Sequence, residues 1–117
     1  MVQKKDPYLY DGKIIRVIDG DSFEIVFDLG FYVTVRTTCR LYGINTPEIR
    51  GKNKSKRGFE VKQYVEELIL DKTFEIEVLK TTGKYGRWLV DIYLDKTKKK
   101  TLTKQLLQEK MGKRITY

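Results

Sequence analysis

Three short polar stretches of this chain carry side chains that could hold and hydrolyse a phosphate ester. They span residues 19–22, 40–48 and 84–87. The first two stretches contain Asp21 and Asn45, whose side-chain oxygens are ligands of the kind that a hard cation prefers. A divalent cation held there would offset the charge that builds up on phosphate oxygens during attack by water.

The second and third stretches also supply a candidate base and two candidate phosphate clamps. Glu48 is suited to accept the proton of an attacking water. Arg40 and Arg87 carry planar guanidinium groups that keep their charge at any working pH. Together with the oxygen ligands, these side chains predict metal-assisted hydrolysis of phosphodiester bonds.

The charge of the chain favours an anionic partner. Its 117 residues include 24 Lys and Arg against 16 Asp and Glu, a net charge of +8. Two runs hold much of the excess: Arg50, Lys52, Lys54, Lys56 and Arg57, then Lys96, Lys98, Lys99, Lys100 and Lys104. Alone, each run is typical of a solvated loop, but beside phosphate-type residues they favour a nucleic acid bound mainly through its backbone.

The absence of histidine excludes several hydrolytic mechanisms. With 0 His and 1 Cys, the chain has no Ser-His-Asp triad, no histidine-dependent ribonuclease site and no four-ligand zinc site of soft donors. A single cysteine, Cys39, forms no internal disulfide, and we interpret it as a small buried side chain. Hydrolysis would have to use carboxylates, arginines, tyrosines and a hard metal.

The hydrophobic pattern predicts five strands and two helices. Runs of β-branched and aromatic residues predict strands at 10–17, 23–27, 31–41, 74–78 and 88–94. Apolar residues at helical spacing predict a helix within 54–70, with Ser55 as its N-cap, and a short helix after Thr101 that stops at Gly112. Five strands with a helix after the third predict an α+β, mainly β fold: the five-stranded Greek-key barrel of an OB-fold.

The length of the chain predicts one domain over residues 1–117, with 1–9 as an N-terminal arm. The basic residues near the start have no apolar stretch behind them, so no secretory signal is expected. We therefore expect a cytoplasmic protein, or a secreted one if the chain is a processed form. Without an apolar run of membrane-spanning length, no membrane association is expected.

The three polar stretches resemble the motifs of the staphylococcal nuclease (thermonuclease) family. The resemblance covers roughly 12–112, and it rests on three motifs in the family's order: Val17-Ile18-Asp19-Gly20-Asp21-Ser22, then Arg40-Leu41 through Thr46-Pro47-Glu48, then Lys84-Tyr85-Gly86-Arg87. It implies a calcium-dependent nuclease on an OB-fold that cleaves DNA and RNA at the 5′ P–O bond and leaves 3′-phosphate products. The partners would be DNA and RNA, preferentially single-stranded, and the protein would be a monomer or a weak dimer.

The resemblance also implies a role for each site residue. Asp21, Asn45 and the backbone carbonyl of Thr46 would be calcium ligands. The remaining roles follow by position: Glu48 as general base, Arg40 and Arg87 as phosphate clamps, Lys84 and Tyr85 at a terminal phosphate of the bound nucleotide, and Asp19 in contact with metal-bound water.

Asn45 departs from the family pattern, which usually has a second ligand aspartate there. Its amide removes one negative charge, so we expect weaker calcium binding and tolerance of other divalent ions. Two alternatives remain: a non-catalytic OB-fold module that binds nucleic acid or protein, and a basic translation or ribosomal protein with the same barrel. The joint presence of Asp21, Arg40, Glu48 and Arg87 favours catalysis.

Overall fold

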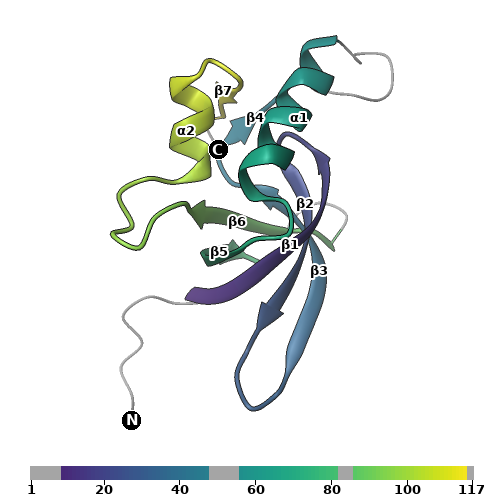
Figure 1. The fold of residues 1–117 in the computed structure, drawn as a ribbon, viewed down its shortest axis with the longest axis vertical. Coiled ribbons are helices and arrows are strands. Elements are labelled where there is room, and N and C mark those ends of the chain that lie inside the picture. Colours follow the sequence, from purple (N-terminus) through teal and green to yellow (C-terminus); the bar gives the residue numbers. More distant parts are fainter. Residues whose placement is uncertain (1–8, 48–55, 82–85, 116–117) are drawn as a thin grey trace.

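The computed structural model describes residues 9–47, 56–81 and 86–115. Five of its strands close a barrel in the order β1-β2-β3-β6-β5 (Figure 1). They are β1 (Leu9–Asp19), β2 (Ser22–Asp28), β3 (Thr34–Leu41), β5 (Thr73–Lys80) and β6 (Trp88–Tyr93). Neighbouring strands are antiparallel except β3 and β6, which run parallel. This is the predicted OB-fold arrangement, with a helix between the third and fourth barrel strands.

The barrel interior is filled by alternate residues of each strand. The fully buried side chains include Ile14 of β1, Phe23, Ile25 and Phe27 of β2, Cys39 and Leu41 of β3, Ile76 of β5, and Ile92 of β6. Burial raises the pKa of the Cys39 thiol to about 12, so this side chain is an inert part of the core. The interpretation of Cys39 as a small buried side chain is confirmed.

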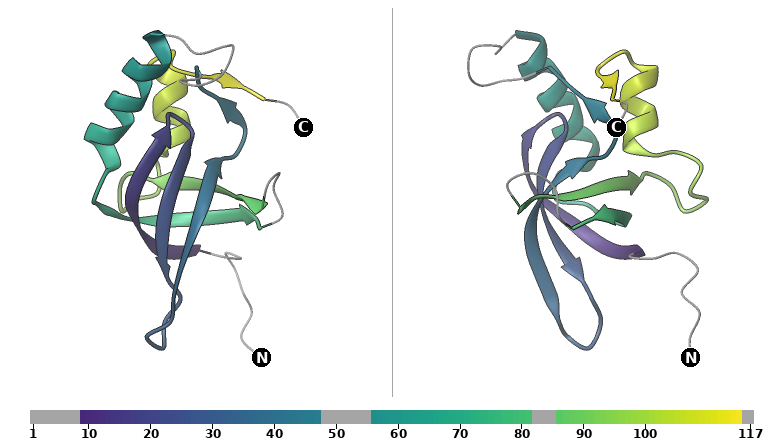
Figure 2. Two further views of the ribbon diagram at one scale, coloured as in Figure 1. Left: turned by 90° about the vertical axis from the view of Figure 1, so that its right-hand side faces the viewer. Right: turned by 180° about the vertical axis from the view of Figure 1, so that it is seen from behind.

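Helix α1 (Lys56–Ile69) covers the end of the barrel at which the β1–β2 turn lies (Figures 1 and 2). Its apolar stripe follows the helical period, with Val61, Val65 and Ile69 fully buried. Tyr64 and Leu68 pack at the edge of the same stripe. The helix predicted within 54–70 is therefore confirmed for the described residues, whereas its predicted cap, Ser55, lies outside them.

Helix α2 (Leu102–Gln108) begins where the sequence predicts and ends earlier. The Thr101 hydroxyl caps it by accepting a hydrogen bond from Lys104 N–H at 3.2 Å. The helix ends because Lys110 adopts a left-handed conformation, with φ 58°, and Met111 N–H donates to the Leu106 carbonyl at 2.8 Å. The prediction that Gly112 stops the helix was wrong, since a lysine takes the position that usually favours glycine.

A second, two-stranded sheet joins β4 (Ile44–Asn45) to β7 (Lys113–Arg114), and the sequence did not predict it. Asn45 lies opposite Lys113 and Ile44 opposite Arg114. Strands of two residues are too short to show a period-2 pattern. This pair lies at the helical end of the barrel (Figure 2). None of the helices in the described residues is long and apolar enough to cross a membrane.

The β2–β3 hairpin projects away from the barrel, at the end opposite α1 (Figures 1 and 2). The sequence predicts a strand from Phe31 onwards, but β3 begins only at Thr34. Phe31 and Tyr32 form the hairpin turn, with φ of 56° and 61°. The prediction was wrong because the pairing of Asp28 with Thr34 and the 2.9 Å bond from Leu29 N–H to the Val33 carbonyl leave these aromatic residues at the tip.

We expect a double replacement, Phe31→Asn with Tyr32→Gly, to stabilise the fold by about 1 to 2 kcal/mol. Positive φ at both central residues is the requirement of a type I′ turn, which Asn-Gly meets best. The aromatic side chains make little contact that could be lost, since they are 96% and 107% exposed. Urea unfolding measures the gain. A matched control, Phe31→Ala with Tyr32→Ala, removes the same rings and keeps the strain, so an equal gain there would refute the explanation.

Candidate functional site

The turn between β1 and β2 places two aspartates at the helical end of the barrel. Asp19 Oδ1 accepts the backbone N–H of Asp21 at 3.2 Å, a local bond that shapes the turn. The Asp21 carbonyl accepts the N–H of Leu41 at 2.8 Å. The turn is thereby attached to the end of β3, the strand that carries Arg40.

Gly20 allows this turn to pack closely on its neighbours. A Cβ at Gly20 would lie 2.6 Å from Val61 Cγ1 of α1 and 2.8 Å from Thr46 Oγ1. Neither distance is compatible with a side chain at this position. The glycine therefore lets the aspartate turn contact both α1 and the residue that follows β4.

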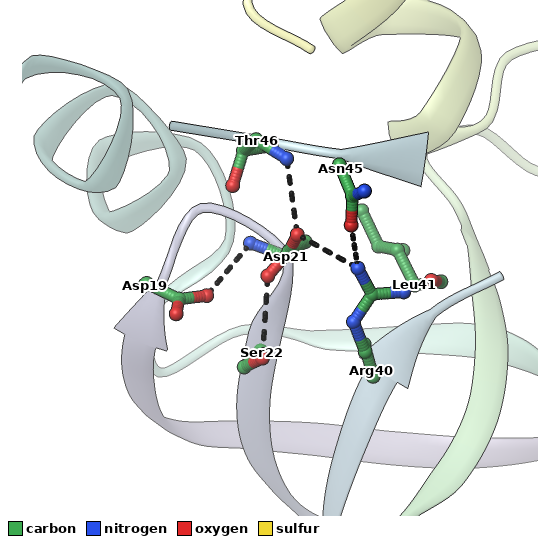
Figure 3. A network of polar contacts seen from close by, with 7 residues as sticks. All are labelled: Asp19, Asp21, Ser22, Arg40, Leu41, Asn45 and Thr46. Atoms are coloured by element: carbon green, nitrogen blue, oxygen red, sulfur yellow. Dashed lines mark hydrogen bonds and ion pairs between the residues drawn. The ribbon is translucent and has the colours of Figure 1, made fainter. Parts of the chain in front are cut away.

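The Asp21 carboxylate is the centre of a buried polar network (Figure 3). Asp21 is 7% exposed. Its Oδ2 accepts the N–H of Thr46 at 3.0 Å and Arg40 Nη2 at 3.4 Å, and its Oδ1 accepts the Ser22 hydroxyl at 3.3 Å. Segments far apart in sequence thus meet on one carboxylate.

Arg40 connects the two oxygen groups that the sequence assigns to a metal. Its Nη2 donates both to Asp21 Oδ2 and to Asn45 Oδ1, and its Nη1 donates to the Leu41 carbonyl at 3.3 Å (Figure 3). Its side chain is only 16% exposed. The guanidinium therefore lies within reach of any anion bound beside Asp21 and Asn45.

Asp19 and Asp21 form an acidic pair in which one member holds its proton readily. Burial is the main cause that raises the pKa of Asp19 to about 7, and the neighbouring carboxylate of Asp21 raises it further. A raised pKa is expected when two carboxyl groups lie close together and at least one of them is partly buried. A bound cation would lower that repulsion.

Of the remaining predicted site residues, the structure describes Arg87. Arg87 directly precedes β6, whose Trp88 pairs with Cys39 and whose Leu89 pairs with Arg40. Packing of the Trp88 ring on Phe27, with 5.3 Å between centroids, fixes this strand start against the barrel. Arg87 therefore lies at the start of the strand that pairs with the Arg40 segment of β3. Glu48, Lys84, Tyr85 and most of the predicted 1–9 arm lie outside the described residues.

The donor set fits a hard divalent cation better than a soft one. The groups at hand are the Asp21 carboxylate, the Asn45 amide oxygen and the oxygens of Thr46, all hard ligands. Thr46 Oγ1 is buried and has no hydrogen-bond partner among the described residues. Within the same residues, no group of three or more His, Cys, Asp or Glu side chains gathers at one place. The set is thus poor in charge, as Asn45 predicts.

Sequence reasoning missed the contacts that hold this network together. Ser22, the backbone N–H of Thr46 and the close approach at Gly20 all support Asp21. The Asp-Gly-Asp-Ser motif contains two of these, but a motif does not show which backbone N–H a carboxylate will accept. Only the tertiary pairing of β3, β4 and the β1–β2 turn determines it.

The structure is thus a closed OB-fold barrel with a cluster of aspartate and arginine side chains at one end. The family model described as "Staphylococcal nuclease homologue" matches residues 38–116. The chain therefore belongs to the staphylococcal nuclease family, as its motifs predict. A comparison with curated proteins finds no match.

Family membership makes the site compatible with nuclease activity and with binding of nucleic acid. Members of the family often use Ca²⁺. The matched region includes Arg40, Asn45 and Thr46 but starts after Asp21. Asp21 is joined to that region by its bonds to Arg40 and Thr46.

Proposed function

We propose that this protein is a calcium-dependent nuclease that hydrolyses DNA and RNA at the 5′ P–O bond and leaves 3′-phosphate products. The observation that carries the proposal is the convergence of Asp21, Arg40 and Asn45 from three separate segments of the chain. An oxygen-ligated cation beside a permanent positive charge is what a phosphodiester transition state requires.

In this proposal Asp21, Asn45 and Thr46 hold the metal, and Asp19 interacts through metal-bound water. The metal, when bound, supplies positive charge next to the phosphate oxygens. The sparse negative charge of the ligand set implies modest calcium affinity and tolerance of other divalent ions.

The remaining residues perform the chemistry. Arg40 turns from its contacts with Asp21 and Asn45 to the phosphate, and Arg87 approaches from the neighbouring strand. Glu48 accepts a proton from water as the water oxygen attacks phosphorus and the bond to the 5′ oxygen breaks. The 5′ oxygen leaves with the bonding electron pair and takes up a proton from solvent to become the 5′-hydroxyl. Lys84 and Tyr85 bind a terminal phosphate of the substrate.

The test is cleavage of single-stranded DNA and of RNA, measured with calcium and with a chelator. We expect cleavage only with calcium, and we expect Glu48→Gln to remove most of it because the proposed general base is then lost. Calcium-independent cleavage would contradict the proposed role of the metal. Binding without cleavage under every metal condition would instead identify a non-catalytic OB-fold module.

A further inference from the structure

Beside the candidate metal ligands lies a cavity of about 360 Å³ with a cationic lining. Arg57 of α1, Lys110 of the turn after α2 and Lys113 of β7 contribute the charges. Among the described residues that line the cavity, none is acidic. Its size falls in the range of small-ligand sites, and its charge selects an anion.

The cavity shares two residues with the site described above. Asn45 and Thr46 line it as well as contacting the Asp21 network. Lys113 lies directly opposite Asn45 in the β4–β7 pair. The residue that carries this ammonium group is therefore the strand neighbour of a proposed metal ligand. An anion held here would be a close neighbour of the phosphate at the metal.

The fold brings these cations together through specific contacts. Arg57 Nη2 donates to the Lys110 carbonyl at 3.4 Å and joins the first turn of α1 to the end of α2, while its Nη1 contacts Glu60 at 3.4 Å. Gly112 lets β7 approach β4, because a Cβ there would lie 2.6 Å from Ile44 Cδ1. A larger residue at Gly112 would move Lys113 away from Asn45.

Lys110 is the least expected member of the set. It adopts φ 58° at the helix end, where glycine is favoured and a side chain is strained. Strain of this kind persists where the surroundings enforce it, and it is frequent at functional sites. Lys110 also places one more charge at the cavity.

From these observations we infer that Arg57, Lys110 and Lys113 bind a backbone phosphate that flanks the scissile one on the same single-stranded nucleic acid. The inference deepens the proposed function and rests on it for the identity of the ligand. Exposed cations beside a phosphate-binding centre contribute sequence-independent, salt-sensitive affinity. A single-strand site commonly spans several nucleotides, so a contact next to the cleavage point is in keeping with such binding.

Lys110→Gly is a sharp test because it should separate stability from binding. We expect a higher Tm, since glycine relieves the left-handed strain, together with about tenfold weaker binding of an oligothymidylate of about ten nucleotides. The slope of log K against log salt should become shallower by about 0.7, the loss of one phosphate contact on a single strand. Binding is measured by fluorescence anisotropy with a chelator present, which prevents cleavage.

Lys98→Gly is the matched control. Lys98 also has a positive φ, 61°, and its ammonium contacts Glu75 at 3.4 Å, away from the cavity. This variant loses the same charge and relieves the same strain, so we expect a similar rise in Tm. Lys98 belongs to the lysine run at 96–104, which also favours a nucleic acid, so we expect a small loss of oligonucleotide binding, well below that of Lys110→Gly. Lys113→Gln, which keeps the backbone of β7, should weaken binding as Lys110→Gly does.

Three results would overturn the inference: no oligonucleotide binding by the unaltered chain, Lys110→Gly and Lys113→Gln variants that bind as tightly as it does, or equal losses in the Lys98 and Lys110 variants. The nuclease proposal stands or falls separately. If the unaltered chain never cleaves with calcium but Lys110→Gly selectively weakens binding, the nuclease proposal fails and the phosphate site stands. If the unaltered chain cleaves with calcium but Lys110→Gly causes no selective loss of binding, the nuclease proposal stands and the phosphate site fails.

Discussion

Arg40→Gln is expected to lower kcat for phosphodiester cleavage by about 10³ to 10⁵, the range found for arginines that stabilise a phosphoryl transition state. Arg40 is the guanidinium that contacts both Asp21 and Asn45, so it is the charge nearest to the proposed metal and phosphate. Glutamine keeps a hydrogen-bond donor, but its side chain is shorter than that of arginine and carries no charge. Single-turnover cleavage of a single-stranded oligonucleotide at saturating calcium measures the loss.

Arg36→Gln is the matched control for Arg40. Arg36 lies four residues earlier on β3 and also pairs with a carboxylate, Glu24, at 2.9 Å. Its side chain is 66% exposed, so the pair contributes little to stability. We expect this variant to keep its kcat, and a comparable fall in both variants would mean that general surface charge controls the reaction.

Calcium binding distinguishes a phosphate clamp from a structural role for Arg40. Removing a cation that contacts two proposed ligands should leave calcium affinity unchanged or increase it, because less positive charge faces the metal. A purely structural Arg40 would support Asp21, and its loss would weaken calcium binding together with activity. Titration of each variant with calcium, followed by Tm, separates the two roles.

Much of the barrel could be predicted because its strands are half buried. Ile14, Ile25 and Ile92 alternate with residues that are half-buried or exposed, and Val61, Val65 and Ile69 repeat at helical spacing. Those periods arise directly from side-chain geometry in strands and helices. The residues that define the barrel strands and α1 are therefore visible in the sequence.

The errors occur where strand pairing or helix-end bonding overrides the preference of single residues. Phe31 and Tyr32 favour strands, yet the β2–β3 register places them in a turn with positive φ. Lys110 ends α2 although nothing in a lysine indicates a left-handed conformation. In both cases the conformation is set by contacts that the local sequence does not specify.

For the candidate site, too, the residue types could be predicted and the contacts between them could not. Its residue types could be predicted, because hard oxygen ligands and arginines are what phosphodiester chemistry uses. The shared position of Arg40 between Asp21 and Asn45 could not, because it depends on where β4 ends relative to the β1–β2 turn. The link from Arg57 to Lys110 joins residues 53 apart in sequence. No motif spans such a distance.

Asn45→Asp is expected to tighten calcium binding by about tenfold or more, because ligand charge is a principal determinant of calcium affinity. Asn45 lies on the exposed side of the network, and its amide oxygen already accepts from Arg40. A carboxylate there keeps that contact and adds one negative charge opposite Asp21. Calorimetric titration measures the affinity, and the rise of Tm with calcium measures it independently.

The same variant should raise cleavage at low calcium and change it little once calcium saturates the site. At saturation the metal is bound in both proteins, so the remaining barrier depends on Glu48 and the arginines. Gln63→Glu is the matched control, since Gln63 is exposed on α1 and gains the same charge away from the network. If Asn45→Asp and Gln63→Glu shift the calcium Kd equally, or neither shifts it, Asn45 is not a calcium ligand. A selective shift for Asn45→Asp would place the metal beside β4, where Lys113 and the cationic cavity begin.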